Sequence, residues 1–340
     1  MRKYRNQIIA VVLGMVLFVS WLWTGKREIS GEDKEIYEEA LGLQEQVDEL
    51  GFGEFCLADY PVAMYDGEWD HVFYDGEIKR RKAVLETFAG TAYPVEDHFE
   101  VIVPTLEQFD SLLSLAGGVE GIVSGSGYGA KEQVATIWHE AFHAYQLTDH
   151  AVLGERITPE EMQEGLEDRM EGGEEILSEE ESIVKEVDEN TDVRNRLEKE
   201  MGLLEDTVEM LRADTREGNG AADLAEHIDG IQEMVLEYRE CRRERMAKMT
   251  EAARDAEIRC ELTEGTAYYV EYSVYGMTAG EKTCEERYLE NLGRYEGGRG
   301  KYYRTGLAKC LILDALAPGW KETFDFTKGL DEVLTACGRM

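Results

Sequence analysis

One stretch of the 340-residue chain, TIWHEAFHAYQ at residues 136–146, restricts the possible folds more than any other. On an α-helix, side chains four positions apart lie one turn apart on the same face. His139 and His143 can therefore offer both imidazoles to one point, with Glu140 beside the first. We expect a helix that begins near Ala130 and turns this polar face toward a site.

The remaining residues of this helix are apolar and predict a packing side. Trp138, Ala141 and Phe142 should face the core. An alternative is that His139 and His143 are themselves core side chains, because buried polar groups usually find hydrogen-bond partners. A further ligand elsewhere in the chain is needed to favour a metal site.

The composition predicts a helix-rich globular protein. Only 5 prolines occur, and 43% of the residues are hydrophobic. Few prolines with many Leu, Glu, Ala and Met residues favour long helices over strands. The formal net charge of -36 repels nucleic-acid phosphates, so nucleic acid is not an expected partner.

The amino terminus predicts a membrane anchor. Residues 6–25 carry no charge, and Arg2, Lys3 and Arg5 precede them. About 20 uncharged residues suffice to cross a bilayer core, and the basic residues favour a cytoplasmic amino terminus. We therefore expect residues 1–26 to be a single-pass anchor with the rest extracytoplasmic. The alternative is a cleaved signal peptide and a secreted protein, but no small-x-small cleavage site is present.

Residues 27–150 predict an α/β lobe that carries the active-site helix. Two YDGE turns favour short antiparallel strands, since an Asp-Gly step suits a tight hairpin. The expected elements are a helix over 32–51, short antiparallel strands over 55–81, a helix over about 77–89, a strand over 98–103 and a helix over 105–118.

Residues 151–220 predict an acidic helical insertion, and residues 221–340 a helical lobe. Within the insertion, residues 155–220 contain 23 acidic and 8 basic residues. Solvated helices are the simplest interpretation. Two alternatives are a surface for a protein partner, and a lid that attracts basic peptides.

A catalytic zinc requires a third protein ligand and an open position. The best match is Glu264 in ELTEGTAYYVEY, within the helical lobe. Glu261 is a rival ligand in the same stretch. Glu264 could also be a carboxylate near a helix cap with no role in binding.

These residues carry a resemblance. HExxH followed by a helix reading Glu-Gly-x-Ala resembles the gluzincin metallopeptidases, whose EGxA helix is similar to EGTA at 264–267. The resemblance implies Zn²⁺ bound by His139, His143 and Glu264, with Glu140 as general base. It also implies a zincin-like α+β fold with a small mixed sheet and a helical carboxy-terminal subdomain. A peptide substrate along a sheet edge, mapped to residues 120–125, follows from the same resemblance.

The chain departs from thermolysin-like members of that group. They place an aspartate four residues after the glutamate ligand, where this chain has Tyr268. Glu261 and Glu271 share the helix face of Glu264, so either could support a ligand instead. No histidine follows His227 to stabilise an oxyanion.

A tyrosine is the expected replacement for that histidine. Tyr268 and Tyr303 are the candidates, although a packed ring is the more common role for a tyrosine. The predicted function is a membrane-anchored zinc metallopeptidase that cleaves peptide or protein substrates. A zinc-activated water would attack the scissile carbonyl while Glu140 moves the proton. The alternative is an acidic helical scaffold whose zincin-like core is structural or inactive.

Overall fold

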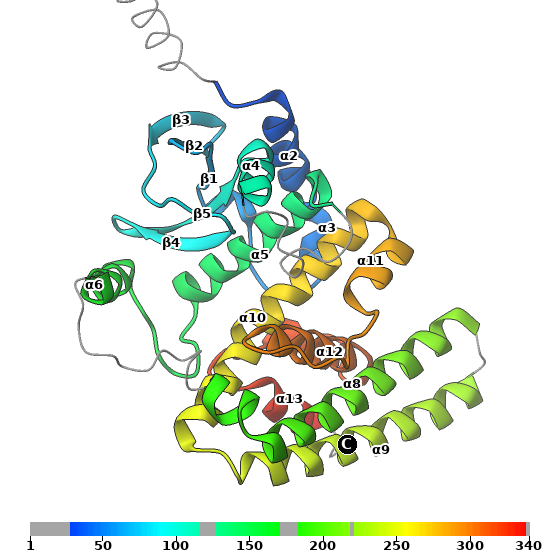
Figure 1. Cartoon of the computed structure of the whole chain (residues 1–340). Helices are drawn as coiled ribbons and strands as arrows, with labels where there is room; N and C mark the ends of the chain where they lie inside the picture. The colour runs from blue at the N-terminus through cyan, green and yellow to red at the C-terminus, as the bar shows by residue number, and fades with distance from the viewer. Residues whose placement is uncertain (1–27, 116–126, 171–182, 218–220, 338–340) are drawn as a thin grey trace, which may run out of the picture.

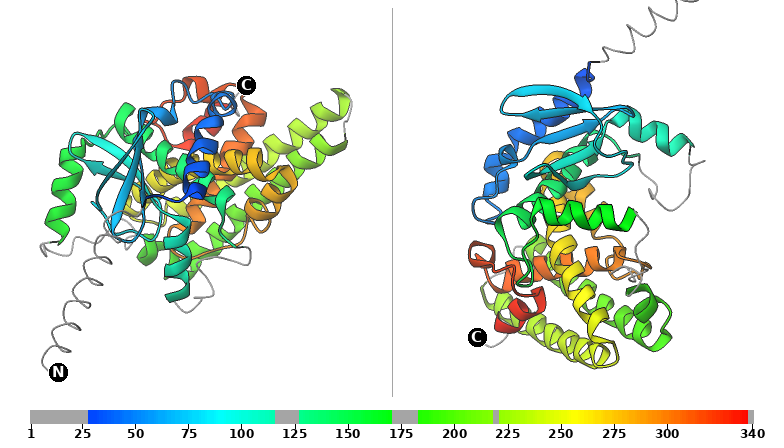
Figure 2. Two further views of the ribbon diagram at one scale, coloured as in Figure 1. Left: turned by 90° about the horizontal axis from the view of Figure 1, so that it is seen from above. Right: turned by 90° about the vertical axis from the view of Figure 1, so that its left-hand side faces the viewer.

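The computed structural model describes residues 28–115, 127–170, 183–217 and 221–337. Its main elements are α2 (Gly31–Gly42), α3 (Gln44–Asp48), β1 (Val62–Tyr65), β2 (Trp69–Tyr74), β3 (Glu77–Lys82), β4 (Thr91–Val95), β5 (His98–Pro104), α4 (Leu106–Leu115), α5 (Ala130–Asp149), α6 (Pro159–Met170), η2 (Val184–Asp188), α8 (Thr191–Glu217), α9 (Ala221–Met246), α10 (Glu251–Ala279), α11 (Glu281–Tyr288), α12 (Gly300–Leu316) and α13 (Leu330–Cys337). The sheet stands at one end of the molecule and the α8–α9 pair at the other, with α10 running between them (Figure 1, Figure 2).

The five-stranded sheet is mixed, with strand order β3-β2-β1-β5-β4. β1 and β5 are parallel, and the other neighbouring pairs are antiparallel. The β2–β3 turn contains Asp75 and Gly76, whose φ angles of 50° and 72° suit the tight turn expected from an Asp-Gly step. β5 confirms the strand predicted over 98–103. β4 is an edge strand of the described sheet.

The helix predicted over 77–89 is wrong, because this segment begins with strand β3. After the two-residue turn, β3 pairs with β2 along its whole length. Arg81 extends from β3 and donates two hydrogen bonds to Glu100 on β5, at 2.8 and 2.5 Å. Hairpin pairing and this ion pair outweigh the helix-forming composition of the segment.

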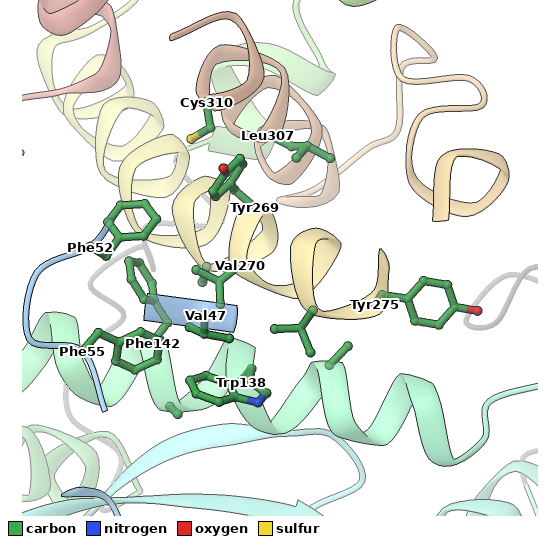
Figure 3. Packing of buried hydrophobic residues seen from close by; sticks show 14 of the residues in the cluster. Val47, Phe52, Phe55, Trp138, Phe142, Tyr269, Val270, Tyr275, Leu307 and Cys310 are labelled. Carbon is green, nitrogen blue, oxygen red and sulfur yellow. The ribbon is translucent and has the colours of Figure 1, made fainter. Parts of the chain in front are cut away.

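The core lies between α5 and the elements that cover it. Trp138, Ala141 and Phe142 are fully buried, which confirms the predicted packing side of α5. The ring of Phe55 contacts those of Trp138 and Phe142, with centroids 5.4 and 5.2 Å apart. Figure 3 shows these rings between α5 and α10, where Val270 also points inward. The apolar side of α5 therefore fixes which face remains for the histidines.

Helices α10 and α12 cross with their backbones in contact at Gly265 and Gly306. A Cβ atom on Gly306 would lie 2.3 Å from the Cα atom of Gly265, and one on Gly265 would lie 2.5 Å from the Cα atom of Gly306. No side chain fits between the helices at this point. The crossing brings the first turn of α12 next to the middle of α10.

The acidic segment is only partly solvated. One face of α8 is buried, and the helix packs on α9 and α12. Leu197, Met201, Leu204 and Val208 are at most 2% exposed. α6 lies instead beside β4. The expectation of solvated helices is therefore wrong for the inner face of α8, which contributes to the core.

The predicted membrane anchor requires a correction of both the fold class and the location. Within the described ranges, no helix combines the length and the apolar character needed to cross a bilayer. The predicted anchor, residues 1–26, lies outside those ranges. The part of the chain that the structure describes is helix-rich with a small mixed sheet and contains no membrane-spanning helix, which corrects the predicted fold class and the predicted single-pass extracytoplasmic location.

Candidate metal centre

Helix α5 begins at Ala130, as predicted, and carries His139 and His143 on one face. Their Nε2 atoms lie 3.1 Å apart. Glu264 approaches from α10, and its Oε2 atom lies 3.2 Å from Nε2 of His143 and 3.8 Å from Nε2 of His139. The structure therefore brings together three residues predicted as ligands, although 121 positions separate His143 from Glu264.

The spacing of these three atoms fits a small tetrahedral cation. Zinc ligands at about 2.0–2.2 Å in tetrahedral geometry are separated from one another by roughly 3.3–3.6 Å. The three distances in the structure, 3.1, 3.2 and 3.8 Å, bracket that range. Two imidazole nitrogens and a carboxylate oxygen are also a donor set that zinc prefers.

Gln146 fixes the tautomer of His143. Its Nε2 atom donates to the backbone oxygen of Thr263 and to Oγ1 of Thr266, which sets the orientation of the amide. The amide oxygen is then the atom that faces His143, 2.9 Å from Nδ1. Because that oxygen can only accept, Nδ1 carries the proton and Nε2 keeps its lone pair for a metal.

The carboxylate of Glu271 lies on the Nδ1 side of His139. Oε2 of Glu271 is 2.8 Å from Nδ1 of His139, although the N–H does not point straight at it. Tyr288 donates a hydrogen bond of 2.8 Å to the other oxygen of Glu271. This contact favours a proton on Nδ1 and leaves Nε2 of His139 as the ligand atom.

The carboxylates and imidazoles of the cluster shift one another's pKa values. Burial acts to lower the pKa of His139, but the carboxylates of Glu264 and Glu271 outweigh it and raise that pKa well above its usual value. Burial acts to raise the pKa of Glu264, but His143 and His139 lower it well below the usual range. The carboxylates thus stabilise positive charge at the imidazoles.

Glu140 lies beside the ligands and, like them, lines a cavity at the surface of the protein. It is about nine-tenths buried, and desolvation raises its pKa. The backbone at Gly90 lies so close that a Cβ atom there would be 2.8 Å from Cγ and Oε1 of Glu140. A glycine at this point therefore leaves room for the carboxylate.

The two predicted tyrosines differ in position. The ring of Tyr303 is stacked near His139, with centroids 6.0 Å apart and planes at 12°, and it borders the cavity. Burial and then the charge of Glu264 raise the pKa of Tyr303. Tyr268 packs between Tyr303 and Tyr288, with centroids 5.6 and 5.1 Å away, and does not line the cavity.

Glu261, the rival ligand, does not reach the centre. It is 1% exposed and belongs to a buried cluster of charges between α9, α10 and α12. Its Oε2 atom accepts from Arg242 at 2.5 Å and from Lys309 at 2.7 Å, and Thr305 donates to Oε1 at 2.7 Å. Glu261 therefore balances buried cations rather than facing the histidines.

The centre opens into a cavity of about 470 Å³. Gly90, Thr91 and Ala92 line it at the start of edge strand β4, and Met162 of α6 lines it from the acidic segment. The sheet edge predicted for substrate, residues 120–125, lies outside the described ranges. The edge that does border the cavity is β4.

Gln146 and Arg299 contact the ligand residues but were not predicted from the sequence. Gln146 lies three positions after His143, so helical spacing could have indicated it. Arg299 lines the cavity, and its Nη2 atom donates to Oε1 of Glu264 at 2.6 Å. No local pattern places Arg299 there, because its approach depends on the crossing of α10 and α12.

Comparison of the chain with protein-family models, curated proteins and solved structures finds no match. The resemblance to gluzincin metallopeptidases thus stays with the residues that carry it, the HEAFH pentapeptide and EGTA at 264–267.

Proposed function

We propose that this protein is a zinc-dependent peptide hydrolase. The observation that carries the proposal is the convergence of His139, His143 and Glu264 on one point beside Glu140, at the wall of an open cavity. Zinc bound at such a site lowers the pKa of water toward neutrality and polarises a carbonyl group.

The residues around the centre have separate tasks in this proposal. Glu140 accepts the proton of the attacking water and passes it to the leaving amine. Tyr303, kept protonated by its raised pKa, donates its O–H to the carbonyl oxygen as negative charge develops there. Gln146 and Glu271 hold the imidazoles in the tautomers that leave Nε2 free.

Edge strand β4 offers a place for an extended substrate. An extended peptide can add to an exposed sheet edge through its backbone groups. The first residues of β4, Thr91 and Ala92, border the cavity, as does Gly90, which lies against Glu140. A peptide aligned with β4 would therefore bring a backbone carbonyl close to the centre.

Three variants test the proposal. Glu140→Gln should retain one zinc per chain but cleave no peptide, because it keeps the ligands and removes the proton acceptor. His143→Ala should lose the zinc. His150→Ala is the matched control, since His150 lines the same cavity outside the ligand set and its variant should retain metal and cleavage.

Metal content by mass spectrometry and cleavage of a peptide mixture are the two measurements. Native protein without stoichiometric zinc, or equal cleavage by native protein and Glu140→Gln, would refute the proposed hydrolase. Zinc binding with no cleavage by the native protein would favour the alternative of a scaffold with a structural metal.

A further inference from the structure

We propose that Arg299 is a positioning residue that holds one oxygen of Glu264, so that only the other oxygen is offered to the metal. The inference rests on the proposed function, because it concerns the same zinc site. Arg299 lines the cavity but lies outside both the HEAFH and the EGTA motif, so neither motif gives it a role.

The two oxygens of Glu264 face different partners. Oε1 accepts a hydrogen bond from Nη2 of Arg299 at 2.6 Å. Oε2 lies 3.2 and 3.8 Å from the Nε2 atoms of His143 and His139. A charge-assisted hydrogen bond of this length is among the stronger polar contacts in proteins, so it opposes rotation of the carboxylate.

Rotation of the carboxylate would change the number of ligand atoms. A carboxylate can bind a cation through one oxygen or through both. A catalytic zinc needs three protein donors and one open position. If both oxygens of Glu264 turned toward the metal, the second would compete for the position that water and substrate require beside Glu140. Arg299 prevents this by keeping Oε1 engaged.

The backbone around Arg299 is itself anchored. Asp188, the last residue of η2, accepts a hydrogen bond from the backbone N–H of Gly298 at 2.8 Å and another from Nζ of Lys301 at 2.9 Å. The hydroxyl of Tyr295 also donates to Asp188. Residues on both sides of Arg299 are thus tied to the acidic segment, which gives the guanidinium a fixed origin for its reach to Glu264.

A competing role for Arg299 is direct contact with substrate. Its side chain is 41% exposed and lines the cavity, so a carbonyl or carboxylate of a substrate could reach it. Contact with substrate alone would leave the metal environment of the substrate-free protein unchanged. The deciding measurement is therefore made without substrate.

The experiment replaces zinc by Co²⁺ and records its visible absorption, which is several-fold weaker for five-coordinate than for four-coordinate cobalt. The Arg299→Ala protein should bind cobalt and show the weaker spectrum, and millimolar guanidinium should restore the native one. With zinc, its kcat should fall by roughly 10–100-fold. Arg259→Ala is the matched control, because Arg259 lines the same cavity but pairs with Glu155. Its cobalt spectrum should equal that of the native protein.

A native spectrum in Arg299→Ala would overturn the inference, and so would complete loss of cobalt binding, which would mean that Arg299 is needed to form the site. A spectrum weakened equally in Arg259→Ala would overturn it as well. If the native protein binds metal but cleaves no peptide, the proposed function fails while the spectra still decide the role of Arg299. A native protein that binds no metal refutes both.

Discussion

The helix crossing at Gly265 and Gly306 makes Gly306→Ala a sharp test of the fold around the site. The new Cβ atom would lie 2.3 Å from the Cα atom of Gly265 and 2.8 Å from the backbone oxygen of Glu261. Carbon atoms in contact lie about 3.5–4.0 Å apart. Both neighbours are backbone atoms, so α10 and α12 must separate by more than about 1 Å.

The magnitude follows from two opposing effects. Overpacking a core costs about 1–3 kcal/mol, and contact with two backbones places this change at the upper end. Replacing glycine by alanine inside a helix contributes about 0.5–1 kcal/mol in the other direction. The free energy of unfolding should therefore fall by about 2 kcal/mol. The separation should also move Arg299 and Tyr303 away from Glu264 and so reduce cleavage.

Urea unfolding at a fixed free zinc concentration measures this change. Gly202→Ala is the matched control, because Gly202 lies in helix α8 and a Cβ atom there would meet nothing within 4 Å. That variant should be as stable as the native protein or slightly more so. If Gly306→Ala also proved no less stable than the native protein, the contact between the two backbones would be refuted.

Three further changes test the surroundings of the centre. Gln146→Leu should weaken zinc binding by roughly 10–100-fold, because Nδ1 of His143 loses its acceptor. Gln163 is exposed, so Gln163→Leu serves as the control. If Gln146→Leu and the native protein had equal zinc affinities in a chelator competition, the role of Gln146 would be contradicted. Glu261→Gln should lower the free energy of unfolding by roughly 3 kcal/mol or more, because Arg242 and Lys309 lose a buried partner. Its zinc content should stay the same as that of the native protein. Loss of zinc with unchanged stability would instead make Glu261 the ligand. Burial opposes ionisation of Glu257, but Arg245 and Arg242 outweigh it and lower its pKa from 4.5 to about 2. The stabilising contribution of ionised Glu257 is therefore present above pH 4.5 and is lost as the pH falls toward 2. The difference in unfolding free energy between the native protein and Glu257→Gln should shrink across that pH range. A difference that stays constant would argue against this ion pairing.

The ligand set could be predicted from the sequence because it depends on local periodicity and on zinc chemistry. HExxH on a helix fixes the relation of His139 to His143, and the same helical logic placed Glu271 on the face of Glu264. Helical spacing alone could not show whether Glu261 or Glu271 is the carboxylate that supports a histidine ligand. That choice depends on Arg242 and the other buried cations near Glu261, which come from distant helices.

The wrong and missing predictions have a common physical cause, because contacts between distant segments override the structural preference of the local sequence. Residues 77–82 have a composition suited to helix, yet pairing with β2 makes them a strand. The acidic composition of α8 predicted solvation, but its apolar residues recur at helical spacing and are buried on one face. Arg299 reaches Glu264 only because two glycines allow α12 to cross α10 closely.

The distance between His143 and Glu264 along the chain gives a metal at this centre a second effect. The two residues stand 121 positions apart in sequence and 3.2 Å apart in space, on helices from different parts of the fold. A cation bound between them would act as a reversible cross-link that closes a long loop of the chain. Unfolding would then release the metal, so stability would rise with its free concentration, by about 2.7 kcal/mol at one hundred times Kd.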